Sequence, residues 1–153
     1  MKKLLAMVMA VAMTLSLAAC GGNSTPAASG STGSASSEAG SAANADFKVG
    51  AIYINSKNDT AGYTYAHHNG ITKAMEELGL DPDSQLVIVD EVKDNDYDGI
   101  ASAVDTLVAA DCNIIFGISF GYMQAMADKA QEYPNVIFSH ATGYMSNDTN
   151  FNN

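Results

Sequence analysis

The amino-acid sequence predicts an α/β fold in which a Rossmann-like, doubly wound parallel sheet occupies residues 46–153. The strand-like segments are continuous apolar runs, as expected for strands that are buried on both faces. Amphipathic helical segments separate these runs, and such alternation is typical of parallel sheets with right-handed connections. The length of this part suits one small domain.

Four short segments rich in β-branched and aromatic residues are expected to form the strands. They cover 47–54 (FKVGAIYI), 86–89 (LVIV), 113–116 (NIIF) and 136–138.

Three longer segments are expected to be helices, because apolar residues recur in them at helical spacing. They cover about 63–78, 97–110 and 122–132. Gly79 follows the first helix and favours a stop there. Aspartates crowd the start of the second helix, where they suit the positive end of the helix dipole.

The end of the chain, 140–153, is polar and has no closing helix. A doubly wound sheet of only four strands would leave its last strand unprotected. We therefore expect the chain to be a fragment, or its second half to be supplied elsewhere.

The N-terminus predicts export and lipid attachment. Lys2 and Lys3 precede an apolar run over 4–17, and small residues then lead to Cys20, which is the pattern of an export signal. The ending resembles the lipobox of bacterial lipoproteins, which implies that acyl chains such as palmitate on Cys20 hold the protein at the extracytoplasmic face of the cell membrane. An ordinary signal peptide, with Cys20 incidental, is the alternative.

Residues 21–45 are almost entirely Gly, Ser, Thr, Ala, Asn and Pro, with Glu38 the only charge. Such a segment cannot bury enough apolar surface to fold, so it is expected to be a disordered tether.

The charge balance restricts the partners. The chain has 7 Lys+Arg against 17 Asp+Glu and a net charge of −10, whereas nucleic acid binding requires many cationic contacts to phosphate. Nucleic acid is therefore excluded as a partner, and a neutral or cationic small molecule is favoured over an anionic one. Cys112 lacks a second cysteine to pair with once Cys20 is acylated, so it is expected to be a small buried hydrophobe.

Ligand sites in such sheets lie beyond the carboxyl ends of the strands. Four segments should meet there: 55–65, 90–98, 117–122 and 140–144. They combine aromatic rings for stacking with amides, hydroxyls and carboxylates for hydrogen bonds, as a flat heterocycle attached to a sugar would require. Aromatic side chains that merely cap the core are the alternative. The candidates are Asn58, Asp59, Tyr63, Tyr65, Ser119, Phe120, Tyr122, His140, Thr142 and Tyr144.

The sequence resembles the basic membrane protein (BMP) family of substrate-binding lipoproteins of ABC transporters across essentially all of 47–153. The likeness rests on Asp59 with Gly62-Tyr63, on Ser-Phe-Gly-Tyr at 119–122 and on His-Ala-Thr-Gly-Tyr at 140–144. It implies the first lobe of a type I periplasmic-binding fold that binds purine nucleosides or bases and delivers them to a membrane permease.

The resemblance also implies particular contacts. Asn58 and Asp59 would contact the ligand, Tyr63 or Tyr65 would stack on the base, and 120–122 would line the pocket. Family members have roughly twice the mature length of this chain, and Gln124 stands where close relatives are expected to carry Asp.

Two other motifs suggest different classes of site. Gly117-x-Ser119-x-Gly121 between a strand and a helix resembles a nucleophile elbow, and Asp128 and His140 follow in the order of a catalytic triad. A surface-tethered serine hydrolase is thus an alternative, although Asp128 falls inside a predicted helix.

The second motif, Asp94-x-Asp96-x-Asp98-Gly99 with Asp105 at the twelfth position, nearly fits a calcium loop. An acidic helix cap is the preferred interpretation. His67 and His68 are adjacent and point to different sides of a helix, so they make a poor metal pair.

The sequence therefore predicts a solute-binding lipoprotein of an ABC importer that is not an enzyme and carries no cofactor or metal. A receptor-type sensor that passes ligand occupancy to a membrane kinase remains the other alternative.

Overall fold

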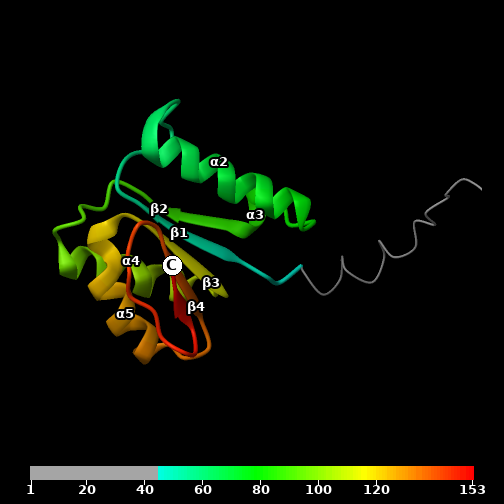
Figure 1. Ribbon diagram of the computed structural model, residues 1–153. Helices are drawn as coiled ribbons and strands as arrows, with labels where there is room; N and C mark the ends of the chain where they lie inside the picture. The colour runs from blue at the N-terminus through cyan, green and yellow to red at the C-terminus, as the bar shows by residue number, and fades with distance from the viewer. Residues whose placement is uncertain (1–44) are drawn as a thin grey trace, which may run out of the picture. The chain divides into compact units, whose positions relative to one another are not determined.

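The computed structural model describes residues 45–153 (Figure 1). The predicted export signal, Cys20 and nearly all of the tether lie outside these residues. None of the helices within the described range combines the length and the apolar character that crossing a membrane requires.

The centre of the fold is a five-stranded sheet with the order β2-β1-β3-β4-β5. Every neighbouring pair of strands is parallel, which confirms the predicted fold class. The strands are β1 (Val49–Tyr53), β2 (Leu86–Val89), β3 (Ile114–Ile118), β4 (Ile137–His140) and β5 (Phe151–Asn152).

The three predicted helices are present, and their ends differ from the predicted ones by at most one residue. They are α2 (Gly62–Glu77), α4 (Tyr97–Ala109) and α5 (Met123–Glu132). Two single turns were not predicted: α3 (Pro82–Gln85) and the 3-10 turn η1 (Phe120–Tyr122). The side chain of Asp81 caps α3 by accepting a hydrogen bond from the Asp83 amide at 3.0 Å.

The strand register divides the apolar side chains between the two faces of the sheet, because paired residues of parallel strands share a face and alternate along each strand. Ile52, Ile115 and Phe138 pack with α4 and α5 in one cluster. Val49, Ala51 and Tyr53 belong to two other clusters, which contain residues of α2. Figure 1 shows α4 and α5 on one side of the sheet and α2 on the other.

The expectation of a sheet with only four strands was wrong, because a fifth strand follows β4. β5 pairs in parallel with β4, with Phe138 opposite Phe151, and the Phe151 ring is only 2% exposed. The buried Asn150 amide fixes this strand, because its Nδ2 donates to the carbonyl oxygens of Ala130 and Val136, both at 2.9 Å. A polar segment can therefore supply an edge strand when its side chains satisfy the neighbouring backbone.

Candidate functional site

The loops that follow β1 and β2 are joined at the carboxyl edge of the sheet. The Lys57 amide donates to Oδ2 of Asp90 at 2.8 Å. The Val92 amide donates to the carbonyl oxygen of Tyr53, the last residue of β1, at 3.0 Å. The β2–α4 loop therefore extends over the end of β1.

The same β2–α4 loop also reaches the segment after β3. The Ser119 hydroxyl donates to Oδ2 of Asp94 at 3.2 Å, and the Tyr122 hydroxyl donates to the Val92 carbonyl at 2.5 Å. A Cβ added to Gly121 would lie 2.2 Å from the Asp94 carbonyl oxygen. Only glycine allows the two backbones to approach this closely.

The segments that follow β3 and β4 are joined as well. The Ala141 amide donates to the Gly117 carbonyl at 2.9 Å, and the Tyr144 amide donates to Sδ of Met123 at 3.3 Å. The rings of Phe120 and Tyr144 lie 6.3 Å apart between centroids. All four segments that were predicted to meet thus lie at one edge of the sheet, which we call the rim.

The rim contains the topological switch point of the sheet. β1 and β3 are neighbours, whereas the chain leaves β1 towards β2 on one side and leaves β3 towards β4 on the other. In open parallel sheets the loops diverge at such a point and leave a crevice where ligands bind.

Several aromatic rings at the rim are presented to solvent. Their exposed fractions are 39% for Tyr63, 40% for Tyr65, 54% for Phe120 and 74% for Tyr144. Asn58 is exposed and Asp59 is half-buried in the loop that precedes them. Large exposed aromatic side chains gathered at one edge are typical of a binding surface.

These candidates form two groups on the rim. Asn58, Asp59 and Tyr63 lie between β1 and the first turn of α2, while Phe120 and Gly121 lie between β3 and α5. Within residues 45–153, no hydrogen bond joins one group to the other.

Tyr122 packs inside the fold and not on the surface of the rim. Its side chain is 0% exposed, and its hydroxyl donates to Val92. Burial raises the pKa of Tyr122 above its ordinary value, with smaller contributions from Asp94 and Tyr63. The expected role of this side chain as a pocket wall is thus replaced by a structural one, because the ring fills the core beneath the rim.

His140 is also enclosed, with 3% of its surface exposed. Its Nε2 lies 2.9 Å from the Met145 carbonyl oxygen, and its Nδ1 is buried without a hydrogen-bond partner. A Cβ on Gly143 would lie 1.7 Å from the imidazole, so the 141–144 turn folds closely over the ring. The buried His140 ring therefore packs beneath the 141–144 turn and supports its conformation.

The serine-hydrolase arrangement is not assembled among the described residues. Ser119 donates to Asp94 and not to a histidine. Asp128 accepts a hydrogen bond from the Tyr97 hydroxyl at 2.8 Å, and the His140 ring is bonded to Met145. The three residues have separate partners, whereas a triad needs a hydrogen-bonded series.

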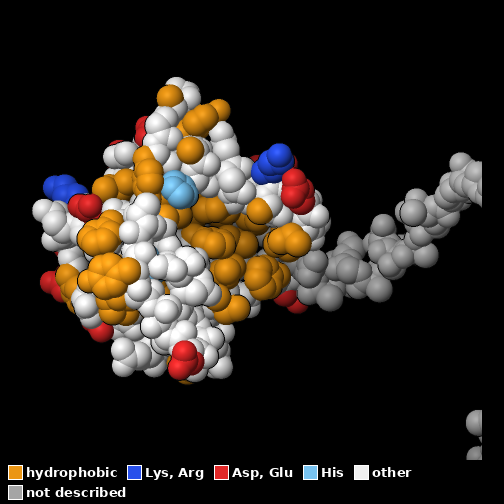
Figure 2. Space-filling view, viewed as in Figure 1, with side chains coloured by type: hydrophobic (Ala, Val, Ile, Leu, Met, Phe, Trp, Pro, Cys, Tyr) orange, Lys and Arg blue, Asp and Glu red, His pale blue; other side chains and the backbone are white. Residues whose placement is uncertain are grey.

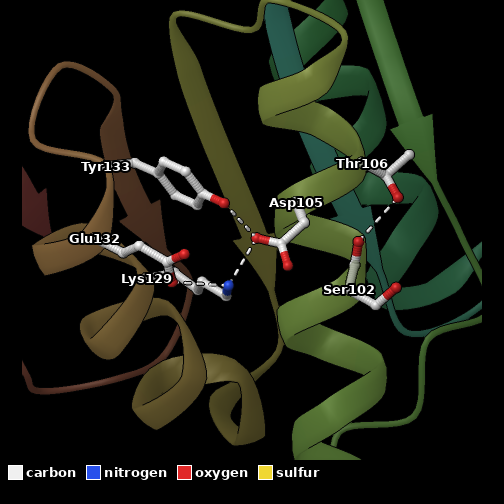
Figure 3. Close-up of polar contacts among 6 residues, drawn as sticks. All are labelled: Ser102, Asp105, Thr106, Lys129, Glu132 and Tyr133. Atoms are coloured by element: carbon white, nitrogen blue, oxygen red, sulfur yellow. Dashed lines mark hydrogen bonds and ion pairs between the residues drawn. The ribbon is translucent and has the colours of Figure 1, made fainter.

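The calcium-loop residues are likewise used for other purposes. Asp96 caps α4 by accepting from the Gly99 amide at 3.0 Å, which confirms the acidic-cap interpretation. Asp105 pairs with Lys129 at 2.7 Å and accepts from the Tyr133 hydroxyl at 2.8 Å, as Figure 3 shows. Within 45–153, no group of three or more His, Cys, Asp or Glu residues could hold a metal ion.

The adjacent histidines, His67 and His68, contact different residues. His68 Nδ1 lies 3.0 Å from the Tyr53 hydroxyl, and His67 packs edge-on against Tyr63 with 4.5 Å between ring centroids. Cys112 is 3% exposed, and burial raises the pKa of its thiol to about 11, as expected for a small buried hydrophobe.

A hollow that the sequence did not predict lies on the α2 side of the sheet. It has a volume of about 490 Å³, and Figure 2 shows apolar side chains gathered there beside α2. Of the predicted site residues, only His140 is among those that line it. We call it the α2 groove; it is lined by Phe47, Val49, Ala66, His67, Gly70, Ile71, Ala74, Met75, Leu78, Leu80, Ile114, Phe116, Ile118, Ser139, His140 and Ala141.

The sequence is similar to known binding proteins. No protein-family model matches the chain. Over 117 residues, 71% of the chain, it is 34% identical to a purine-binding protein of Brucella abortus (strain 2308), of which the match covers 30%. A stretch of 34 residues, 22% of the chain, is 50% identical to a Haloferax volcanii protein named as an ABC transporter glucose-binding protein, of which 9% is covered.

Two solved structures share the fold. An ABC transporter solute-binding protein from Aeropyrum pernix K1 matches with a TM-score of 0.54 and 18% identity over 69% of this chain and 27% of its own. A transcriptional activator of the comK gene from Bacillus halodurans matches with a TM-score of 0.54 and 20% identity over 68% and 32%, respectively. At these identities the likeness concerns the fold alone, and it agrees with the predicted α/β class.

Proposed function

We propose that this chain is part of a solute-binding protein of the BMP type, which captures purine nucleosides or bases for an ABC importer. The observation that carries the proposal is the 34% identity to a purine-binding protein over 71% of the chain. The rim supports it independently, because it presents aromatic rings beside polar loops at the switch point of the sheet.

The rim residues have chemistry suited to such a ligand. Asn58 and Asp59 offer an amide and a carboxylate to the hydroxyls and N–H groups of a nucleoside. Tyr63, Tyr65 and Phe120 offer faces for stacking on the base. Gly121 brings its backbone to the same edge, while Tyr122 and His140 support the rim from inside.

The described residues supply one wall of the proposed site. Tight binding of a small molecule requires that most of its surface be buried, and within residues 45–153 the rings at the rim are exposed to solvent. A second lobe faces this wall in the complete binding protein, and hinge closure traps the solute between the two. The closed form then docks on the permease.

In this proposal, the N-terminal residues determine where in the cell the protein is held. Cleavage before Cys20 and acylation of that residue hold the protein at the extracytoplasmic face of the membrane, and residues 21–45 serve as the tether. Metabolic labelling with an alkyne analogue of palmitate in a bacterial host tests this. Label is expected in the wild-type chain and absent in Cys20→Ala; equal labelling of both would contradict the lipid anchor.

A titration followed by NMR tests the ligand class. Adenosine at millimolar concentration is expected to shift the amide signals of Asp59, Tyr63 and Phe120 in the full chain, while glucose leaves them unchanged. Binding weaker than micromolar is expected because residues 45–153 supply one wall of the site. An affinity of micromolar or tighter would refute the half-site, and the absence of any shift with purines would refute the ligand class.

A matched pair of variants locates the binding. Phe120→Ala removes an exposed ring at the rim and is expected to weaken the adenosine shifts several-fold. Leu78→Ala removes a side chain that is 69% exposed at the end of α2 and is expected to leave them unchanged. Equal effects of the two variants would place the binding away from the rim.

A further inference from the structure

The loop between β2 and α4 reaches both groups of candidate residues at the rim. On the β1 side, the Asp90 side chain accepts a hydrogen bond from the Lys57 amide at 2.8 Å. On the β3 side, the Asp94 side chain accepts from the Ser119 hydroxyl at 3.2 Å. This loop therefore connects the two sides of the crevice, which no direct hydrogen bond between the two groups does within residues 45–153.

Asp94 is held at the switch point from two sides. Ser119, which is only 5% exposed, donates to Oδ2 of Asp94. Gly121 lets the two backbones approach, because a Cβ there would collide with the Asp94 carbonyl. Burial is the main reason why the pKa of Tyr122 is raised, but Asp94 and Tyr63 both add to it. Asp94 and Tyr63 therefore lie near the same hydroxyl, although they belong to different loops.

The Asp94 carboxylate keeps hydrogen-bonding capacity for a ligand. The residue is exposed, and its Oδ1 has no hydrogen-bond partner within residues 45–153, whereas Oδ2 has the Ser119 hydroxyl. A carboxylate accepts up to about four hydrogen bonds and donates none. A carboxylate whose position is fixed in this way suits a ligand that presents adjacent hydrogen-bond donors.

The sugar of a nucleoside presents two such donors. The 2′- and 3′-hydroxyls of ribose lie side by side, so the two oxygens of one carboxylate can accept from both. The edge of adenine places a donor beside an acceptor, which a side-chain amide matches and an acceptor-only carboxylate does not. The exposed rings of Tyr63 and Phe120 remain available for stacking on the base.

We propose that Asp94 is a specificity-determining residue that accepts hydrogen bonds from the sugar hydroxyls of a purine nucleoside, and that Ser119 is its positioning residue. The inference rests on the proposed function, which it narrows from purine nucleosides or bases to nucleosides. It also gives the Ser119 hydroxyl, which the sequence suggested as a nucleophile, the task of orienting a carboxylate.

A cycle of two ligands and two proteins tests the proposal. The ligands are adenosine and 2′,3′-dideoxyadenosine, which lacks both hydroxyls. The proteins are the full wild-type chain and Asp94→Asn, which keeps the size of the side chain and an acceptor for Ser119. The measurement is the initial slope of the Tyr63 and Phe120 amide shifts against ligand concentration, because this slope can be determined for weak binding.

The two changes are expected to be non-additive. In the wild type, loss of the hydroxyls should reduce the slope about tenfold, because hydrogen bonds to a charged acceptor are strong. Asp94→Asn should reduce the adenosine slope by a similar factor and leave the dideoxyadenosine slope unchanged. Ser119→Ala should reduce the adenosine slope by a smaller factor and also spare dideoxyadenosine.

Asp148→Asn is the matched control, because it removes the same charge from a different place. Asp148 is exposed and lies in the turn that leads into β5, whose partner β4 is parallel. This turn is therefore at the edge of the sheet opposite the rim. The variant is expected to leave both slopes unchanged.

Three results would overturn the proposal while the purine ligand class stands. They are an adenosine slope that Asp94→Asn leaves unchanged, an equal reduction of the adenosine and dideoxyadenosine slopes, and binding of adenine without binding of adenosine. The second result would give Asp94 a merely structural role. Failure of both adenosine and adenine to shift any amide of the rim would instead refute the ligand class, and this inference with it.

Discussion

The two faces of the sheet differ in how completely helices cover them. On the face under α4 and α5, the side chains of Ile52, Ile115 and Phe138 are 0% exposed. On the α2 face, Ile137 is 48% exposed and Leu78, at the end of α2, is 69% exposed. The strands carry apolar residues towards both sides. Among the described helices, α4 and α5 cover one side fully, whereas α2 buries β1 on the other side and leaves Ile137 exposed.

This difference teaches that apolar strands and complete burial are separate properties. A continuous apolar strand indicates that other segments must pack on both of its faces. It does not indicate which segments these are. The closed face should therefore carry most of the stability of the described part, while substitutions on the open face should cost little on their own.

The largest effect is expected on the closed face. Leu107→Ala removes a side chain that is 0% exposed in the cluster of α4, α5 and the sheet. Deleting a buried leucine leaves a cavity, so the free energy of unfolding should fall by about 2–5 kcal/mol. Urea denaturation followed by circular dichroism measures this. A loss below about 1 kcal/mol would show that the closed face is less well packed than it looks.

A smaller loss is expected where β5 completes the closed face. Asn150→Ala removes the donor to the carbonyl oxygens of Ala130 and Val136, and unsatisfied buried groups cost about 1–3 kcal/mol. The same denaturation experiment applies, with Asn152→Ala, an exposed position in β5, as the matched control. Equal losses for the two variants would mean that the amide does not hold the edge strand.

The ion pair between α4 and α5 should make the closed face slightly sensitive to acid. Partial desolvation raises the pKa of the Asp105 carboxyl, but hydrogen bonds from Lys129 and Tyr133 outweigh it and hold the pKa below its ordinary value. The stabilisation is therefore complete above the ordinary carboxyl pKa of about 4 and is lost as the pH falls through the lowered value.

Because Asp105 is 46% exposed, this contribution should be less than about 1 kcal/mol. Unfolding free energies measured between pH 6 and pH 3 should fall slightly more for the wild type than for Asp105→Asn. Parallel curves for the two proteins would show that the pair adds nothing to stability.

The smallest effect is expected on the open face. Leu78→Ala removes an apolar side chain with 69% exposure, so the unfolding free energy of the full chain should change by less than about 0.5 kcal/mol. A loss comparable to that of Leu107→Ala would contradict the contrast between the faces, because it would mean that Leu78 is already buried by another part of the chain.

Much of the fold could be predicted from the sequence because local and long-range signals agree. The long helices carry apolar residues at helical spacing, and Asp96 marks the start of α4. β5 could not be predicted, because two residues in an Asn-rich segment carry no strand pattern, and the strand depends on the distant contacts of Asn150. The single turn α3 had a readable signal, since Asp81 and Pro82 form an N-terminal cap.

The position of the candidate site could be predicted from the sequence, but the side chains that it exposes could not. Parallel topology brings the four loops to one edge whatever residues they carry. Whether Tyr122 or Phe120 faces outwards depends on the turn after β3, in which Tyr122 is 0% exposed and Phe120 is 54% exposed. The sequence alone does not distinguish two aromatic residues that are two positions apart in a turn.

The central position of β1 also determines the order in which the sheet can form. β1 is the first of the described strands to be synthesised, yet its two neighbours begin at Leu86 and Ile114. At typical rates of translation the later strand follows on the order of seconds afterwards, and such non-local pairing folds slowly. The nascent chain therefore carries β1 as an apolar, unpaired strand for an extended period. We expect chaperones to bind this strand first, because it is the first segment of the chain that is prone to aggregation.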